Sequence, residues 1–177
     1  MDKTTKTRIL IVSSIVILLS LLNIWLSEIP NFSPIAAMAL FGGAYLSEKK
    51  LALIIPLGAL FLSDLFIGLH SLMWAVYLSF GVIVLIGSRI KKPTVFNVLG
   101  ASLTSSVLFF LVTNFAVWLE GGYYPMNFGG LATCYEMAIP FFHNSVFGDL
   151  MFSSSIFCLF YLIKLQYPIL DKNYISK

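Results

Sequence analysis

The amino-acid sequence predicts an all-α integral membrane protein, built as a bundle of six transmembrane helices. Composition is the first reason: of 177 residues, 59% are hydrophobic and only 11% are charged, and the mean hydropathy is +0.92. Soluble domains carry about 25% charged residues, so a soluble fold of this length would have a largely apolar surface. The composition therefore excludes a soluble enzyme, a nucleic-acid-binding protein and a disordered chain.

Apolar segments are the second reason. A hydrocarbon core about 30 Å thick is crossed by a helix of about 20 apolar residues. The second predicted span is short, and its Gly42-Gly43 pair is expected to loosen its inner end. Pro56 lies inside the third, where neighbouring helices can satisfy the freed carbonyl. The predicted spans form a single domain over residues 1–177 and lie at about 9–27, 33–46, 51–68, 72–88, 97–119 and 146–165.

Lysine and arginine predict the orientation, because they gather on the cytoplasmic side of membrane proteins. With six spans, all 11 basic residues fall on one side, whereas five or seven spans scatter them over both. The connections at 28–32, 69–71 and 120–145 contain none. We therefore expect both termini to be cytoplasmic, in a bacterial plasma (inner) membrane. The basic residues are Lys3, Lys6, Arg8, Lys49, Lys50, Arg89, Lys91, Lys92, Lys164, Lys172 and Lys177.

Three polar residues are predicted to share a layer near the outer end. Asp64 lies four residues before the end of the third span and Asp149 three residues into the last. Asn114 lies five residues before the end of the fifth, with Trp118 as its i+4 neighbour. At 1.5 Å per residue, the three lie about 5–8 Å below the outer mouth. Two carboxylates at one depth repel unless a cation, a shared proton or a donor-rich ligand lies between them.

Ionisable groups inside a membrane are costly and point to function, so Asp64, Asn114 and Asp149 are the predicted floor of a binding site. The alternative is that each aspartate caps or hydrogen-bonds a neighbouring helix.

The longest connection, residues 120–145, is predicted to be a lid over this layer. Its 26 residues exceed what a simple connection needs, and loops of that length are often binding loops. Tyr123, Tyr124 and Tyr135 offer flat faces with polar tips and, with Trp118, are the predicted walls of the site. The alternative for the tyrosines is an interfacial aromatic belt. Residues 131–142 are apolar enough for a re-entrant half-helix, broken by a proline.

His143 and Asn144 complete the predicted substrate-binding set, since both can hydrogen-bond a solute at the outer face. The alternative for the histidine is that it is simply solvated. With two cysteines and two histidines, the chain has too few ligands for a structural zinc site. We predict no metal site and no cofactor.

Two stretches of the chain carry a resemblance to a known family. They are residues 31–44 (NFSPIAAMALFGGA) and 56–68 (PLGALFLSDLFIG). Both look like the second and third helices of S components, the substrate-binding subunits of energy-coupling-factor (ECF) vitamin transporters. Nearly the full chain, including residues 112–118 (VTNFAVW) and 148–150 (GDL), more closely resembles an uncharacterised group of small bacterial membrane proteins assigned to transport.

The resemblance implies a six-helix subunit that captures a vitamin, a vitamin precursor or a metal at the outer face under gating loops. It also implies two kinds of partner, a transmembrane coupling protein and cytoplasmic ATPases. One feature departs from the family: S components that share a coupling module commonly carry an Ala-x-x-x-Ala pattern in the first helix, and residues 9–27 contain no alanine.

We therefore predict a substrate-specific membrane subunit for uptake of a small solute, with the solute and the lipid bilayer as partners and no nucleic acid. The sequence has no glycine-rich phosphate loop, His-Glu-x-x-His or Gly-x-Ser-x-Gly motif, so an enzyme is not expected. Two alternatives stay open: an autonomous proton- or cation-coupled carrier or channel, and a scaffold subunit that transports nothing.

Overall fold

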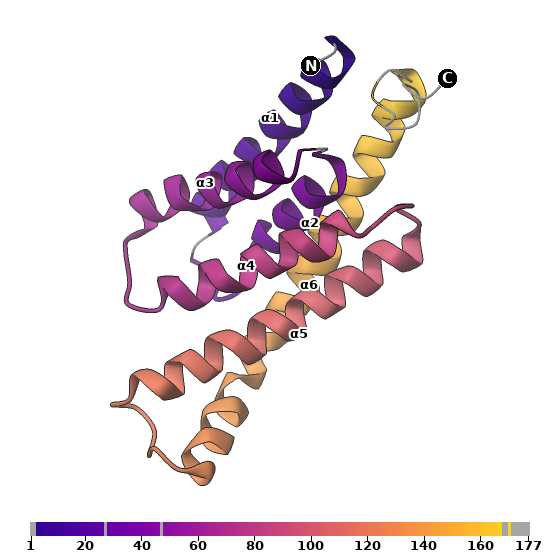
Figure 1. Ribbon diagram of the computed structural model, residues 1–177. Helices are drawn as coiled ribbons and strands as arrows, with labels where there is room; N and C mark the ends of the chain where they lie inside the picture. Colours follow the sequence, from indigo (N-terminus) through magenta and orange to yellow (C-terminus); the bar gives the residue numbers. More distant parts are fainter. Residues whose placement is uncertain (1–2, 27, 47, 168–169, 171–177) are drawn as a thin grey trace.

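The structure is a computed structural model that describes residues 3–26, 28–46, 48–167 and 170. This part of the chain folds into six α-helices, and no strand is present among these residues (Figure 1). The all-helical prediction is thus confirmed for the described residues. The helices are α1 (Lys3–Leu26), α2 (Ile35–Tyr45), α3 (Lys49–Ile67), α4 (Met73–Ser88), α5 (Val95–Glu120) and α6 (Phe128–Gln166).

Helix α2 is the centre of the bundle. It contacts each of the other five helices, and residues 36–45 are all buried. Its glycines allow this: a Cβ on Gly43 would lie 2.2 Å from the Val84 carbonyl oxygen of α4. On the facing helix, a Cβ on Gly87 would lie 2.3 Å from the Leu40 carbonyl oxygen. The backbones of α2 and α4 therefore touch, as small residues allow in membrane helices.

Helices α1, α3, α5 and α6 are each long and apolar enough to cross a membrane, whereas α2 and α4 are apolar but shorter, with 11 and 16 residues. Large apolar side chains cover the outside of the bundle, for example Trp25, which is 80% exposed, and Phe66, which is 75% exposed. Such a surface is stable in lipid rather than in water. These helices indicate a membrane-embedded protein.

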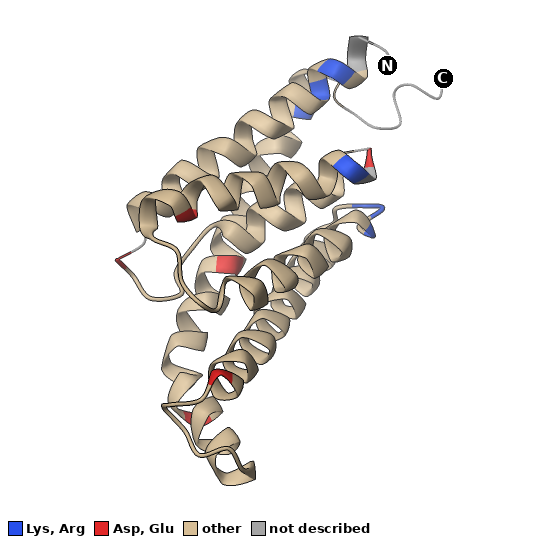
Figure 2. Ribbon diagram, turned by 60° about the vertical axis from the view of Figure 1, so that its left-hand side comes forward, with Lys and Arg blue, Asp and Glu red and all other residues tan. Residues whose placement is uncertain are grey.

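Basic residues lie at one end of the molecule. Figure 2 shows the blue segments at the N-terminal part of α1, the start of α3 and the α4–α5 connection. Among the described residues, the acidic ones lie towards the middle and the opposite end, apart from one at the α2–α3 connection (Figure 2). The α1–α2 and α3–α4 connections lie at the end opposite the basic residues.

Helices α5 and α6 form a hairpin that projects beyond the other four helices (Figure 1). The 39 residues of α6 span about 58 Å, nearly twice a hydrocarbon core of about 30 Å. The prediction of a lid loop over 120–145 is therefore wrong, because residues 128–145 belong to α6 and only 121–127 connect the two helices. The predicted break of a half-helix over 131–142 is wrong too, since α6 continues through Pro140. We call residues 110–142 the α5–α6 hairpin.

Capping explains why α6 begins so early. Asn127 is its N-cap, and the side-chain oxygen accepts a hydrogen bond from the Gly130 backbone N–H at 2.9 Å. Gly130 is needed there because a Cβ would lie 2.0 Å from the Pro125 carbonyl oxygen. Of the four glycines at 121, 122, 129 and 130, Gly121 and Gly122 adopt positive φ, +76° and +89°, so one glycine pair makes the turn and the other begins the helix.

Candidate functional site

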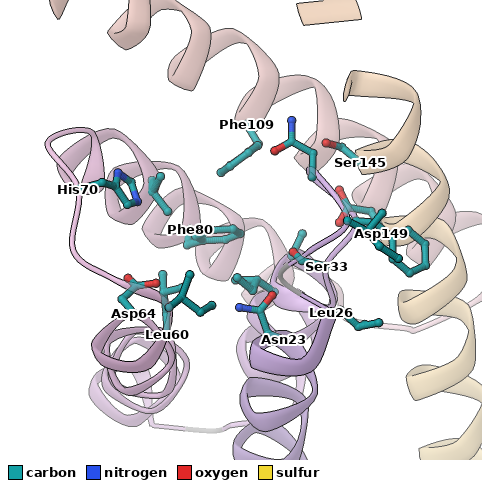
Figure 3. A pocket seen from close by; sticks show the side chains of 17 residues that line it. Asn23, Leu26, Ser33, Leu60, Asp64, His70, Phe80, Phe109, Ser145 and Asp149 are labelled. Carbon is teal, nitrogen blue, oxygen red and sulfur yellow. The ribbon is translucent and has the colours of Figure 1, made fainter. Parts of the chain in front are cut away.

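A pocket of about 260 Å³ lies inside the bundle, and residues from all six helices line it (Figure 3). The α1–α2 and α3–α4 connections border it, so it lies towards the end opposite the basic residues. The lining residues are Asn23, Leu26, Ile29, Asn31, Phe32, Ser33, Ile35, Ala36, Leu60, Asp64, Ile67, His70, Val76, Phe80, Phe109, Ser145 and Asp149.

Asp64 lies in the last turn of α3 and is 8% exposed. Its Oδ2 accepts a hydrogen bond of 2.6 Å from the Tyr77 hydroxyl of α4. No other described residue hydrogen-bonds this carboxylate, so Oδ1 is left open. Tyr77 thus fixes the rotamer of Asp64 and leaves one oxygen available to a solute.

Asp149 faces the same pocket from α6 and is 6% exposed. Its Oδ2 accepts a hydrogen bond of 2.6 Å from the Ser106 hydroxyl of α5, and among the described residues Oδ1 has no partner. Figure 3 shows Asp64 and Asp149 on opposite sides of the pocket. The two carboxylates therefore line one pocket from opposite sides, and each is held by a hydroxyl of a neighbouring helix.

Asn23 supplies a third polar group from α1 and is 4% exposed. Its Nδ2 donates to Ser63 Oγ at 2.9 Å, which orients the amide and leaves Oδ1 without a partner in the described part of the chain. In the view of Figure 3, Asn23 lies between the two carboxylates. The arrangement repeats that of the aspartates: one atom is anchored to the protein and one acceptor oxygen is open.

The α1–α2 connection forms a wall of the pocket and is attached to α6. Asn144 Nδ2 donates to the Pro30 carbonyl oxygen at 3.0 Å, and the Phe32 ring stacks on Phe147 at a centroid distance of 6.1 Å. A Cβ on Gly148 would lie 3.1 Å from the Phe32 ring. Asn144 therefore does not line the pocket; it holds the segment that does.

Two predicted wall residues instead hold the hairpin together. Trp118 Nε1 donates to the Pro125 carbonyl oxygen at 3.0 Å, and the Tyr135 hydroxyl donates to the Leu111 carbonyl oxygen at 2.7 Å. Both bonds join one part of the hairpin to another. Neither side chain lines the pocket.

The remaining predicted residues also lie outside the pocket. Asn114 Nδ2 donates to the Phe110 carbonyl oxygen one turn earlier, at 2.8 Å. Tyr123 is 79% exposed, His143 is exposed and Tyr124 is partly exposed. The prediction that these residues share one site with the aspartates is therefore wrong, because the hairpin projects away from the six-helix body.

Comparison with known proteins identifies the family of the chain but does not assign it an activity. The model of DUF6580, a family of unknown function, matches residues 3–170. The chain belongs to this family. Neither the curated proteins nor the solved structures contain a match. For this family member, the geometry of the pocket is therefore the basis for inferring function.

Sequence reasoning missed several pocket residues. Asn23 is the only amide side chain of α1, and that isolation in an apolar helix was a usable signal. Asn31 and His70 lie in short connections between helices. Because the length of a short connection gives no sign of a functional role, neither residue was predicted. Asn31 adopts φ +57°, a left-handed conformation that asparagine tolerates better than most residues, and no sequence pattern identified that turn.

The pocket is not built as a metal centre. Among the described residues, no group of three or more His, Cys, Asp and Glu side chains is placed to hold a metal ion. What the pocket can do chemically is accept hydrogen bonds from opposite walls.

Proposed function

We propose that this protein is a substrate-specific membrane subunit for the uptake of a small solute, which binds in the pocket between Asp64 and Asp149. The observation that carries this function is the pocket itself: all six helices contribute to it, and its buried polar groups each keep an acceptor open. Buried polar groups normally have at least one hydrogen-bond partner, and Asp64, Asp149 and Asn23 each have one within the protein. Their second oxygens have no partner among the described residues and belong to side chains that line the pocket, so they are available to a ligand.

The position of the pocket fits capture from outside the cell. In the proposed topology, all six helices cross or enter the membrane, and the basic end with both termini faces the cytoplasm. The α1–α2 and α3–α4 connections then border the pocket on the outer side. The site would receive a solute from outside the bacterial plasma membrane and catalyse no reaction.

Uptake against a gradient needs an energy source, and none of the six helices carries a nucleotide-binding motif. A transmembrane coupling protein with cytoplasmic ATPases is the partner that we propose, on the resemblance to S components. The absence of alanine from the first span favours a dedicated coupling protein, or a serine-based contact, over the usual shared one.

Native mass spectrometry tests the binding function. Wild-type protein purified in mild detergent should carry a bound small molecule, and the double variant Asp64→Asn/Asp149→Asn should lose it. Glu120→Gln is the matched control, since it changes a carboxylate to an amide on the exposed hairpin. A ligand-free wild type, or a double variant that keeps its ligand, would contradict the assignment.

Cysteine labelling tests the topology. In a chain without its own two cysteines, His70→Cys should react with a membrane-impermeant maleimide in intact cells. Lys91→Cys should react only after the cells are permeabilised. The reverse pattern would place the pocket on the cytoplasmic side and contradict capture from outside.

A further inference from the structure

We propose that the solute is a compact organic cation, a protonated amine that donates hydrogen bonds to both carboxylates while its carbon skeleton lies against aromatic rings. This inference names the substrate class of the same pocket and rests on the proposed function. It is based on three observations: the hydrogen-bonding character of the polar atoms in the pocket, the charge of the lining residues and the apolar walls.

The open side-chain atoms of the three buried residues that face the pocket from α1, α3 and α6 are acceptors, whereas the possible donors in the lining, Asn31, Ser33 and His70, are exposed or only partly buried. Asp64, Asp149 and Asn23 are each more than nine-tenths buried. Each has one side-chain atom fixed by a neighbour at 2.6 to 2.9 Å, and the other oxygen without a partner among the described residues. A solute that offers only acceptors would leave these oxygens unsatisfied, at about 1–3 kcal/mol each. A solute with several N–H donors satisfies them.

The charge of the pocket points the same way. Among the described residues, its lining contains two aspartates and no lysine or arginine, and His70 on the α3–α4 connection is the only other ionisable one. Two carboxylates at one cavity repel unless a cation, a shared proton or a donor-rich ligand lies between them, and an ammonium group on the solute supplies both the positive charge and the donors. An anionic solute would add to the repulsion.

The walls favour an organic ion over a bare metal. Phe80 and Phe109 both line the pocket, and their ring centroids are 5.3 Å apart. Leu60 adds an aliphatic surface. Aromatic faces attract ammonium groups, whereas hard metal cations require several oxygen ligands and water. The pocket volume of about 260 Å³ limits the occupant to a small molecule.

A panel of size-matched probes tests the substrate class. Purified protein is heated with primary amines, the corresponding alcohols and the corresponding carboxylates, each series running from butyl to phenylpropyl skeletons. A ligand that binds only the folded state raises the Tm. We expect amines to raise the Tm of the wild type by several degrees, and alcohols and carboxylates to leave it unchanged.

The variants place the effect in the pocket. Each shift is measured against the same variant without probe, so a change in stability does not mimic a change in binding. Asp64→Asn and Asp149→Asn should each weaken amine binding about tenfold or more, by loss of a charge-assisted hydrogen bond. Glu120→Gln should bind as the wild type does. If one aspartate variant fails to fold, the other provides the comparison.

The outcomes separate the two proposals. Alcohols or carboxylates that bind in the aspartate-dependent manner would overturn the cation assignment and leave solute capture standing. An amine shift that persists in both aspartate variants would also overturn it. If no probe of any class binds and the wild-type protein carries no co-purified molecule, both the substrate class and the proposed function are wrong.

Discussion

The six-helix body and the α5–α6 hairpin use hydrogen-bonding side chains for different purposes. In the body, Asp64 and Asn23 are anchored by side-chain hydroxyls and keep an oxygen open to the pocket. In the hairpin, Trp118 and Tyr135 donate to backbone carbonyls of the hairpin itself and do not line that pocket. The difference teaches that similar depth along the helices does not place polar residues in one site, because their hydrogen-bond partners differ.

The largest expected effect concerns the packing of the six-helix body. Gly87→Ala should destabilise the whole protein by about 3 kcal/mol or more, because the new Cβ would meet the Leu40 backbone at 2.3 Å and neither helix can yield easily. Gly81→Ala on the same helix is the control, since nothing lies within 4 Å of its Cβ. Thermal unfolding in detergent measures both. Equal Tm values would contradict the close approach of α2 and α4.

A matched pair of tyrosines tests binding next. Tyr77→Phe removes the hydroxyl that holds Asp64, and we expect the affinity for the bound solute to fall about tenfold, the value of one hydrogen bond to a charged group. Tyr135→Phe removes a hydroxyl bond of similar length, 2.7 Å against 2.6 Å, and should leave the affinity unchanged. Calorimetric titration with the co-purified solute compares the two. An equal loss in both variants would mean that hairpin and pocket act as one site.

A smaller effect is expected at the contact between α6 and the α1–α2 connection. Asn144→Ala removes the hydrogen bond to Pro30, at a cost of about 1 kcal/mol, and should weaken solute binding a few-fold by loosening one wall. His143→Ala, at the neighbouring exposed position, should change nothing. Both variants are compared in the same titration, and a larger loss for His143→Ala would restore that residue to the site.

The smallest effect is confined to the hairpin. Trp118→Phe removes the bond to the Pro125 carbonyl while it keeps an aromatic ring at the 5.6 Å contact with Phe115. We expect faster hydrogen exchange of amides in 121–127 and no change in solute affinity. Unchanged exchange would show that other contacts hold the turn.

Much of the fold could be predicted from the sequence, because the length of an apolar segment and the residues that end it are local signals. They predicted six helices and a basic end, and the two aspartates that the sequence singled out, Asp64 and Asp149, line one pocket. The hairpin could not be predicted, since residues 120–145 were expected to form a loop and a proline was expected to break a helix there. The early start of α6 depends on the N-cap at Asn127 and on the close approach of Gly130 to the Pro125 carbonyl, which are features of local geometry.

The pocket was only half predicted for the same reason. Charge in an apolar segment is visible in the sequence, so the aspartates were found. Asn23 and His70 belong to the site only because α1 packs on α3 and the α3–α4 connection borders the pocket. Whether these two residues reach the pocket depends on which helices pack against each other. The lengths of the predicted spans do not determine that packing.

The most direct test of the central claim is an experimental density map of the wild-type protein, purified in native lipid without a detergent exchange. The account predicts density for a small non-protein molecule between Asp64 and Asp149, within hydrogen-bond distance of both. Density for a solute against the α5–α6 hairpin, or a pocket closed by side chains that pair the two aspartates with each other, would contradict it.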